Sequence, residues 1–101
     1  MMKMIYAMIR PEMEREVVSR LEKAGIYPYT RYGVFGRGRQ KGLQVGSVRY
    51  EELAKVTLML AVEEADAARA VETIKIAART GNAGDGKIFV SSLSEVRTIR
   101  K

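Results

Sequence analysis

The sequence contains no cysteine, no histidine and no tryptophan among its 101 residues. Without cysteine the chain forms no disulfide and offers no thiolate nucleophile, and without cysteine and histidine it lacks the usual ligands of structural zinc sites. The absence of histidine also removes every catalytic scheme in which an imidazole acts as the base. The sequence shows no nucleophile with an activating base beside it, so we expect a protein that is not an enzyme.

Long hydrophobic runs are also missing. The sequence has neither a cleavable signal pattern nor an apolar stretch of the roughly 18 residues that a membrane-spanning helix needs. Together with the lack of cysteine, this predicts a cytoplasmic protein. The length fits one domain over residues 1–101, and a hydrophobic content of 47% with 30% charged residues is typical of a globular chain. The net charge of +6 favours an anionic partner.

Hydrophobic periodicity predicts an alternation of strands and helices. An apolar run ends at Ile9, and Pro11 with Glu12 marks the first turn of a helix that stops at Gly25. We expect the further elements to be a strand over 26–35, a long loop from Gly36 to about Leu53, a strand over Val56–Val62, a helix from Glu63 to Ala78 and a final strand that begins at 88–90. The order β-α-β-β-α-β is that of a ferredoxin-like α+β sandwich.

The first and third predicted strands are apolar on both alternating sets of positions. Two helices can cover only one face of a four-stranded sheet, so the second face needs another cover. We expect a homo-oligomer in which the sheets pack inward. The alternative is that the long loop folds over the open face.

The segment GNAGDGK, residues 81–87, places three glycines, an aspartate and a lysine close together. It matches the first seven positions of the P-loop pattern, but Ile88 replaces the magnesium-binding hydroxyl and the segment runs from helix to strand. We therefore reject a P-loop NTPase. Glycines still expose backbone N–H groups that can form an anion-binding nest, to which Lys87 adds a positive charge. The alternative is a helix cap at Gly81 followed by a turn.

A second basic, glycine-rich segment, GRGRQKG, occupies residues 36–42. Such segments are found in turns and in nucleic-acid contacts, and RNA-recognition modules share the β-α-β-β-α-β order. An RNA-binding module is therefore an alternative from another functional class. It is the weaker one, because the aromatic residues that stack bases in such modules are scarce and no full RNA-binding signature surrounds GKIFV.

The segments GRGRQKG and TGNAGDGKIFV, separated by the long loop, resemble the PII family of nitrogen signal-transduction proteins over the whole chain. The segments KMIYAMIRP, FGRGRQKG and GSVRYEEL, the shortened long loop and the ending TIRK are most similar to its nitrogenase-associated NifI branch. The resemblance implies a trimer that binds ATP or ADP in clefts between subunits and binds 2-oxoglutarate beside magnesium-ATP. The long loop would be the mobile T-loop, between the second and third strands of the sandwich, which docks on a target protein.

The resemblance also implies roles for particular residues. Those expected to bind the nucleotide are Gly36, Arg37, Gly38, Thr80, Gly84, Asp85, Gly86, Lys87 and Arg100. Those expected to bind 2-oxoglutarate are Gln40, Lys41 and Lys55, and Gln40 would also coordinate Mg2+ together with the ATP phosphates. The implied function is a nitrogen-status sensor whose target is dinitrogenase, acting with a sister NifI-like subunit. The alternative within the family is a GlnK-like regulator of an ammonium transporter.

Two features depart from the general PII pattern. Family members place two arginines, one residue apart, on the phosphates from a C-terminal strand, whereas here Thr98 takes the first position and Arg100 the second. Arg97 is adjacent to Thr98, and on a strand it would point to the opposite face. The shortened loop also means that Tyr50 cannot be equated with the tyrosine that some members have uridylylated.

Overall fold

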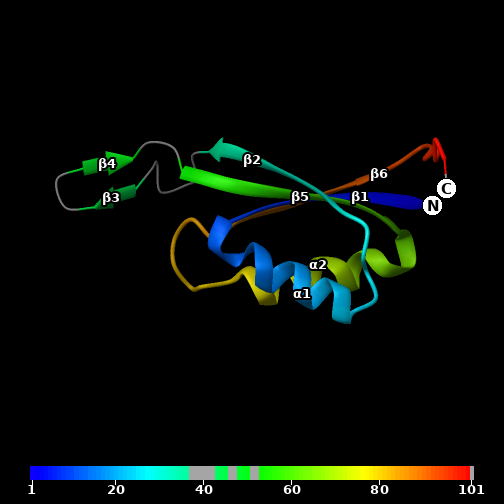
Figure 1. Ribbon diagram of the computed structural model, residues 1–101, viewed down its shortest axis with the longest axis horizontal. Helices are drawn as coiled ribbons and strands as arrows, with labels where there is room; N and C mark the ends of the chain where they lie inside the picture. The colour runs from blue at the N-terminus through cyan, green and yellow to red at the C-terminus, as the bar shows by residue number, and fades with distance from the viewer. Residues whose placement is uncertain (37–42, 46–47, 51–52, 101) are drawn as a thin grey trace.

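The computed structural model describes residues 1–36, 43–45, 48–50 and 53–100. Two helices pack on a four-stranded sheet, and a small hairpin lies beyond one end of that sheet (Figure 1). The elements in chain order are β1 (Met2–Ile9), a 3₁₀ turn (Pro11–Met13), α1 (Glu14–Lys23), β2 (Thr30–Gly36), β3 (Leu43–Val45), β4 (Val48–Tyr50), β5 (Leu53–Glu63), α2 (Glu64–Ala78) and β6 (Gly86–Ser92). The predicted ferredoxin-like fold is confirmed.

Several of the predicted boundaries are wrong. Strand β5 begins at Leu53 rather than at Val56, and β6 begins at Gly86 rather than at Ile88. The second strand begins at Thr30 rather than at Ile26, because Ile26 belongs to the end of α1 and Pro28 follows it. The segment expected to be a loop without regular structure contains the β3–β4 hairpin, in which Leu43 pairs with Tyr50. Among the described residues, neither helix is long and apolar enough to span a membrane.

The main sheet is antiparallel, with the strand order β2-β5-β1-β6. One row across it joins Gly33, Val56, Ile9 and Gly86. The end of β2, the start of β5, the end of β1 and the start of β6 therefore meet at the same end of the sheet. The register thus brings together segments that are distant in sequence.

The end of α1 shows how the sequence fixes a boundary. Gly25 has a φ of +83°, a conformation in which glycine carries no side-chain penalty. The Gly25 N–H donates to the carbonyl of Glu22 at 2.9 Å, and the Ile26 N–H donates to that of Leu21 at 2.9 Å. This is the Schellman arrangement, in which the residue after the glycine also packs back onto the helix. Ile26 is accordingly buried.

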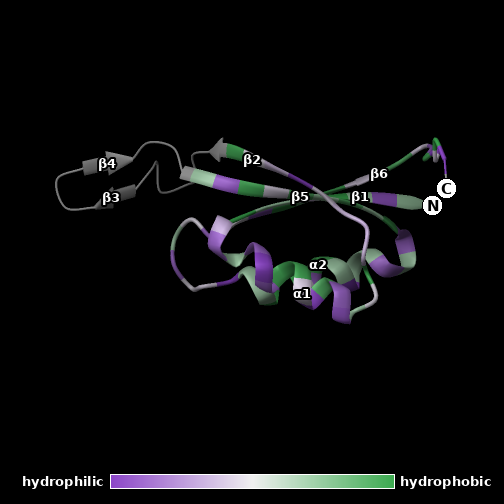
Figure 2. Cartoon of the chain, in the orientation of Figure 1, coloured by the Kyte–Doolittle hydropathy of each residue, from purple (hydrophilic) through white to green (hydrophobic). Residues whose placement is uncertain are grey.

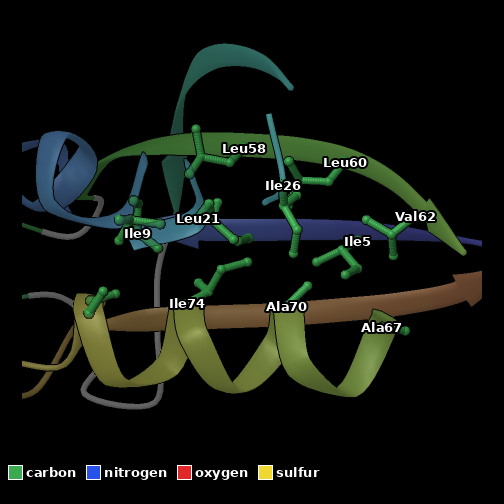
Figure 3. Close-up of a cluster of buried hydrophobic side chains, with 14 of the residues drawn as sticks. Ile5, Ile9, Leu21, Ile26, Leu58, Leu60, Val62, Ala67, Ala70 and Ile74 are labelled. Atoms are coloured by element: carbon green, nitrogen blue, oxygen red, sulfur yellow. The ribbon is translucent and has the colours of Figure 1, made fainter. Parts of the chain in front are cut away.

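The core lies between the helices and one face of the sheet. Figure 3 shows side chains from β1, β5 and α2 pointing into this layer, and Figure 2 shows that each helix carries both hydrophobic and hydrophilic residues. The buried strand residues are Ile5, Ala7, Ile9, Val56, Leu58, Leu60 and Val62; the buried helix residues are Val17, Leu21, Ala67, Ala70, Ile74, Ala77 and Ala78. The small alanines let α2 approach the sheet closely. Each large side chain buried in this layer contributes about 1.5–3 kcal/mol.

The opposite face of the sheet is also apolar, as predicted, and neither helix covers it. Tyr6 on β1 faces Met59 on β5 and Phe89 on β6, and Phe89 is 50% exposed. Tyr32 on β2 is 41% exposed and lies across from Thr57, whose buried hydroxyl has no partner within the described part of the chain. In the ranges that the structure describes, the long loop supplies no cover for these residues. The need for a partner surface therefore remains a prediction.

Candidate functional site

Several segments that carry polar chemistry meet at one end of the sheet. Arg10 directly follows β1, Gly36 ends β2, and Lys55 lies near the start of β5. The glycine loop, which we define as residues 80–86, leads into β6 at the same end (Figure 1). The fold thus brings together Gly36, Lys55 and the glycine loop, which sequence analysis placed in one site.

The glycine loop is built around the carboxylate of Asp85. This carboxylate accepts hydrogen bonds from the backbone N–H groups of Thr80 at 2.9 Å and Gly81 at 3.0 Å, and from the hydroxyl of Thr80. The Thr80 hydroxyl oxygen in turn accepts from the N–H of Asn82 at 3.1 Å. Thr80 and Asp85 therefore shape the loop from within.

Arg10 holds the loop from outside, and sequence analysis missed it. Its Nε donates to Asp85 Oδ1 at 2.9 Å, and its Nη2 donates to the carbonyl of Ala83 at 2.6 Å. The signal in the sequence was indirect: an aspartate inside a loop predicted to bind an anion calls for a cation that neutralises it. The antiparallel register supplies that cation from the end of β1.

The ionisation of Asp85 follows from these contacts. Partial burial favours the neutral acid, but the hydrogen bonds from the Thr80 hydroxyl, the Arg10 guanidinium and the N–H groups of Thr80 and Gly81 outweigh it. They hold the pKa of Asp85 well below its ordinary value of 3.8. At neutral pH the carboxylate is therefore ionised, and its charge is compensated within the protein.

Lys55 reaches the same loop from β5. Its ammonium group donates a hydrogen bond to the carbonyl of Gly84. The pKa of Lys55 is lowered, chiefly by partial burial and to a smaller extent by repulsion from Arg10. The carboxylates of Asp85 and Glu12 act in the opposite direction. Lys55 thus presents a partly desolvated cation beside the glycine loop.

Glycine is required at particular positions of the loop. Gly86 has a φ of +124°, and a Cβ built on it would lie 1.8 Å from the carbonyl oxygen of Met8. Gly81 and Gly84 both have a φ of +89°. The alternative of Gly81 as a helix cap is wrong, because α2 ends at Ala78 and Arg79 is already extended with a ψ of 122°. The glycines therefore serve the loop itself rather than the preceding helix.

An open cleft of about 430 Å³ adjoins the loop, between α2 and β6. Its apolar wall includes Val71 and Ile74 of α2. The lining also contains three cations, Lys75, Arg79 and Lys87. A cleft with an apolar wall and several cations suits an anionic ligand that has an apolar part.

Arg100 is not brought to this site within one chain. Strand β6 starts at Gly86 beside the glycine loop and ends at Ser92, and the C-terminus lies at the opposite end of the sheet (Figure 1). Residues 94–100 are not a strand, so the predicted opposite orientation of Arg97 has no basis in this structure. Arg97 instead pairs with Glu95 at 2.6 Å, and Thr98 is exposed.

The remaining predicted positions can be placed only in part. Arg37, Gly38, Gln40 and Lys41 lie outside the described residues. The backbone of Tyr50 belongs to β4, and its side chain lies outside what the structure describes. Among the described residues, no three acidic side chains lie close enough together to hold a metal ion.

We predict that Asp85→Asn destabilises the protein at pH 7 by about 1.5–3 kcal/mol, as expected for lost hydrogen bonds to a charged group. Because folding lowers the pKa of Asp85, its stabilising contribution is complete above the unfolded value. It is lost progressively as the pH falls below about 5. Urea unfolding at several pH values should therefore show a difference between wild type and variant that is largest at pH 7 and shrinks in acid. The exposed Glu22→Gln serves as the control, and a difference that grew in acid would contradict the assignment.

Comparisons with known proteins agree with this architecture. The sequence profile of the family described as Nitrogen regulatory protein P-II matches residues 2–101. The chain is 49% identical to the nitrogen fixation nifHD2 region GlnB-like protein 1 of Methanosarcina barkeri, over 97% of this chain and 93% of the relative. It is 44% identical to the nitrogen regulatory protein P-II 2 of Methanothermobacter thermautotrophicus, over 98% of this chain and 90% of the relative.

A solved structure gives the same result at the level of the fold. The crystal structure of Arabidopsis thaliana PII bound to citrate superposes with a TM-score of 0.81 at 34% identity. The match covers 97% of this chain and 82% of the plant chain. The chain therefore belongs to the P-II family of nitrogen regulatory proteins.

Proposed function

We propose that this P-II protein is a cytoplasmic nitrogen-status sensor that binds ATP or ADP and, together with Mg2+ and ATP, 2-oxoglutarate. The observation that carries the proposal is the glycine loop, held in shape by Asp85 at the end of the sheet where Arg10, Lys55 and Lys87 lie. In agreement with its family, it acts as a regulator and not as an enzyme. Ligand binding changes its affinity for a protein target.

The nucleotide phosphates fit the start of β6. Lys87 supplies an exposed cation, and glycines at positions 84 and 86 allow a ligand to approach the backbone closely. Asp85, which would otherwise repel phosphate, is already neutralised by Arg10. Gly36 borders the same end of the sheet, and we assign Arg37 and Gly38, which directly follow it in sequence, to the same ligand.

The 2-oxoglutarate site is proposed beside the nucleotide. Lys55 is a partly buried cation suited to a carboxylate, and within the described residues its ammonium group donates to the carbonyl of Gly84. We assign Gln40 and Lys41 to the metabolite as well, with Gln40 also coordinating the Mg2+ that the ATP phosphates hold. The plant relative bound to citrate offers support at the level of chemistry, since citrate is also a carboxylate.

The nucleotide site is completed by a second copy of the chain or by a sister NifI-like subunit. Arg100 lies at the far end of the sheet from Lys87, so both can contact one nucleotide only if they belong to different subunits. The uncovered apolar face around Tyr6 and Phe89 gives a reason for such assembly. We propose a trimer with the uncovered faces packed inward.

The proposed target is dinitrogenase, reached through the segment between β2 and β5. The names of several relatives place them in nitrogen fixation gene regions, which favours this target. The alternative within the family is an ammonium transporter. Pull-down from a nitrogen-fixing cell extract, with and without 2-oxoglutarate, would separate the two targets. Membership of the family leaves the RNA-binding alternative without support.

We predict that calorimetry detects binding of both ATP and ADP. Lys87→Ala should weaken both by about 1.5–3 kcal/mol, because it removes a charged hydrogen bond to phosphate. Lys23→Ala, at the exposed end of α1, removes the same charge far from the loop and is the matched control. Equal losses of nucleotide affinity in the two variants would mean that only the net charge of the protein matters, and not the place of Lys87. Tight RNA binding without ATP binding would contradict the proposal.

We also predict that 2-oxoglutarate binds in the presence of magnesium-ATP and negligibly with ADP or without nucleotide, because the metal supplies part of its ligand shell. By linkage, the metabolite must tighten ATP by the same factor, about 5–150-fold. Lys55→Ala should abolish metabolite binding and keep most of the ATP affinity. Titrations into the three nucleotide states provide the test, and equal metabolite binding in all of them would refute the coupling.

A further inference from the structure

Arg10 makes two separate contacts with the glycine loop, although it belongs to a different part of the chain. It follows Ile9, which pairs with Gly86 at the start of β6. From this place its Nε contacts the carboxylate of Asp85 and its Nη2 contacts the carbonyl of Ala83. The Arg10 side chain is 22% exposed, so much of it is removed from solvent. The contacts join the middle of the loop to the sheet.

Both contacts depend on the shape of a guanidinium group. Arginine presents several N–H donors in a rigid plane, so that one side chain can serve two acceptors at fixed relative positions. Here the acceptors are a carboxylate and a backbone carbonyl two residues apart. A lysine would supply the charge, but its single ammonium group lacks the fixed fork.

The charge of Arg10 matters as much as its shape. Asp85 is ionised, and it lies in the same loop whose glycines and Lys87 are proposed to receive phosphate. An uncompensated carboxylate at this place would repel a polyanion. Arg10 removes that repulsion and lets the carboxylate keep holding the N–H groups of Thr80 and Gly81.

We propose that Arg10 is a positioning residue that holds the glycine loop, through Asp85 and Ala83, in the shape and charge state that bind phosphate. This inference rests on the proposed nucleotide site and adds a residue that does not itself touch the nucleotide. It differs from a direct phosphate contact, since Nε and Nη2 of Arg10 both donate to groups of the protein itself.

The first experiment follows the loop without any ligand. Amide hydrogen exchange is measured for wild type, Arg10→Met, Arg10→Lys and the control Arg20→Met, which breaks the exposed ion pair between Arg20 and Glu16 on α1. We expect the amides of Thr80 and Gly81 to exchange at least about 10-fold faster in Arg10→Met. Arg10→Lys should lie in between, and Arg20→Met should match wild type. Wild-type exchange of these amides in Arg10→Met overturns the proposal, whether or not the protein binds nucleotide.

The second experiment measures ATP binding in the same variants by calorimetry. We expect at least a 10-fold loss of affinity in Arg10→Met, a smaller loss in Arg10→Lys and none in Arg20→Met. Arg10→Met and Asp85→Asn combined should lose little more than the worse single variant, because both act on one unit. Additive losses would indicate a direct phosphate contact and overturn the positioning role. If wild type bound neither ATP nor ADP, the proposed function would fall, and the exchange experiment alone would decide the role of Arg10.

Discussion

The structure depends on a geometric constraint: two helices cover one face of a four-stranded sheet and leave the other face to be covered by something else. The alternation of side chains along β1 sends Ile5 and Ile9 into the core and Tyr6 to the uncovered face. Both sets are apolar, which a strand at the surface of a monomer does not require. The composition of one strand thus leads directly to the expectation of an assembly.

The functional end of the sheet follows from the same register. Antiparallel pairing places the end of β1 beside the start of β6, so that Arg10 meets Asp85 across 75 positions of sequence. The loop then folds around its own carboxylate. Asp85 accepts hydrogen bonds from the N–H groups of Thr80 and Gly81 and forms an ion pair with Arg10. Binding sites built on such preorganised loops bind more tightly because the cost of ordering them is met before the ligand arrives.

Local patterns in the sequence sufficed for the fold but not for the internal contacts of the site. The continuous apolar run of β1, the helical spacing of α2 and the stop at Gly25 are properties of single elements, and these predictions are confirmed. The partnership of Arg10 with Asp85 depends on strand register, which no local pattern encodes.

The same limit explains the errors nearby. The helix cap at Gly81, which was the alternative to a ligand-binding loop, fails because α2 ends at Ala78, before the chain reaches this glycine. The orientation expected for Arg97 assumed that the last strand continues through this residue. In the structure β6 ends at Ser92. The C-terminal segment that carries Arg100 lies far from Lys87 in one chain because of the direction of β6, and the nucleotide site between subunits stays a prediction.

The central claim is that the nucleotide site forms only when a neighbouring subunit supplies the C-terminal segment, and a second copy of this chain is the simplest such neighbour. The most direct test mixes two variants, Lys87→Ala and Arg100→Ala, each of which should bind ATP weakly alone. After unfolding and refolding together, mixed oligomers should regain a fraction of sites with wild-type affinity, because an intact Lys87 from one subunit meets an intact Arg100 from another. If the mixture binds ATP no better than the separate variants, or if the protein is a monomer that binds ATP, the account is contradicted.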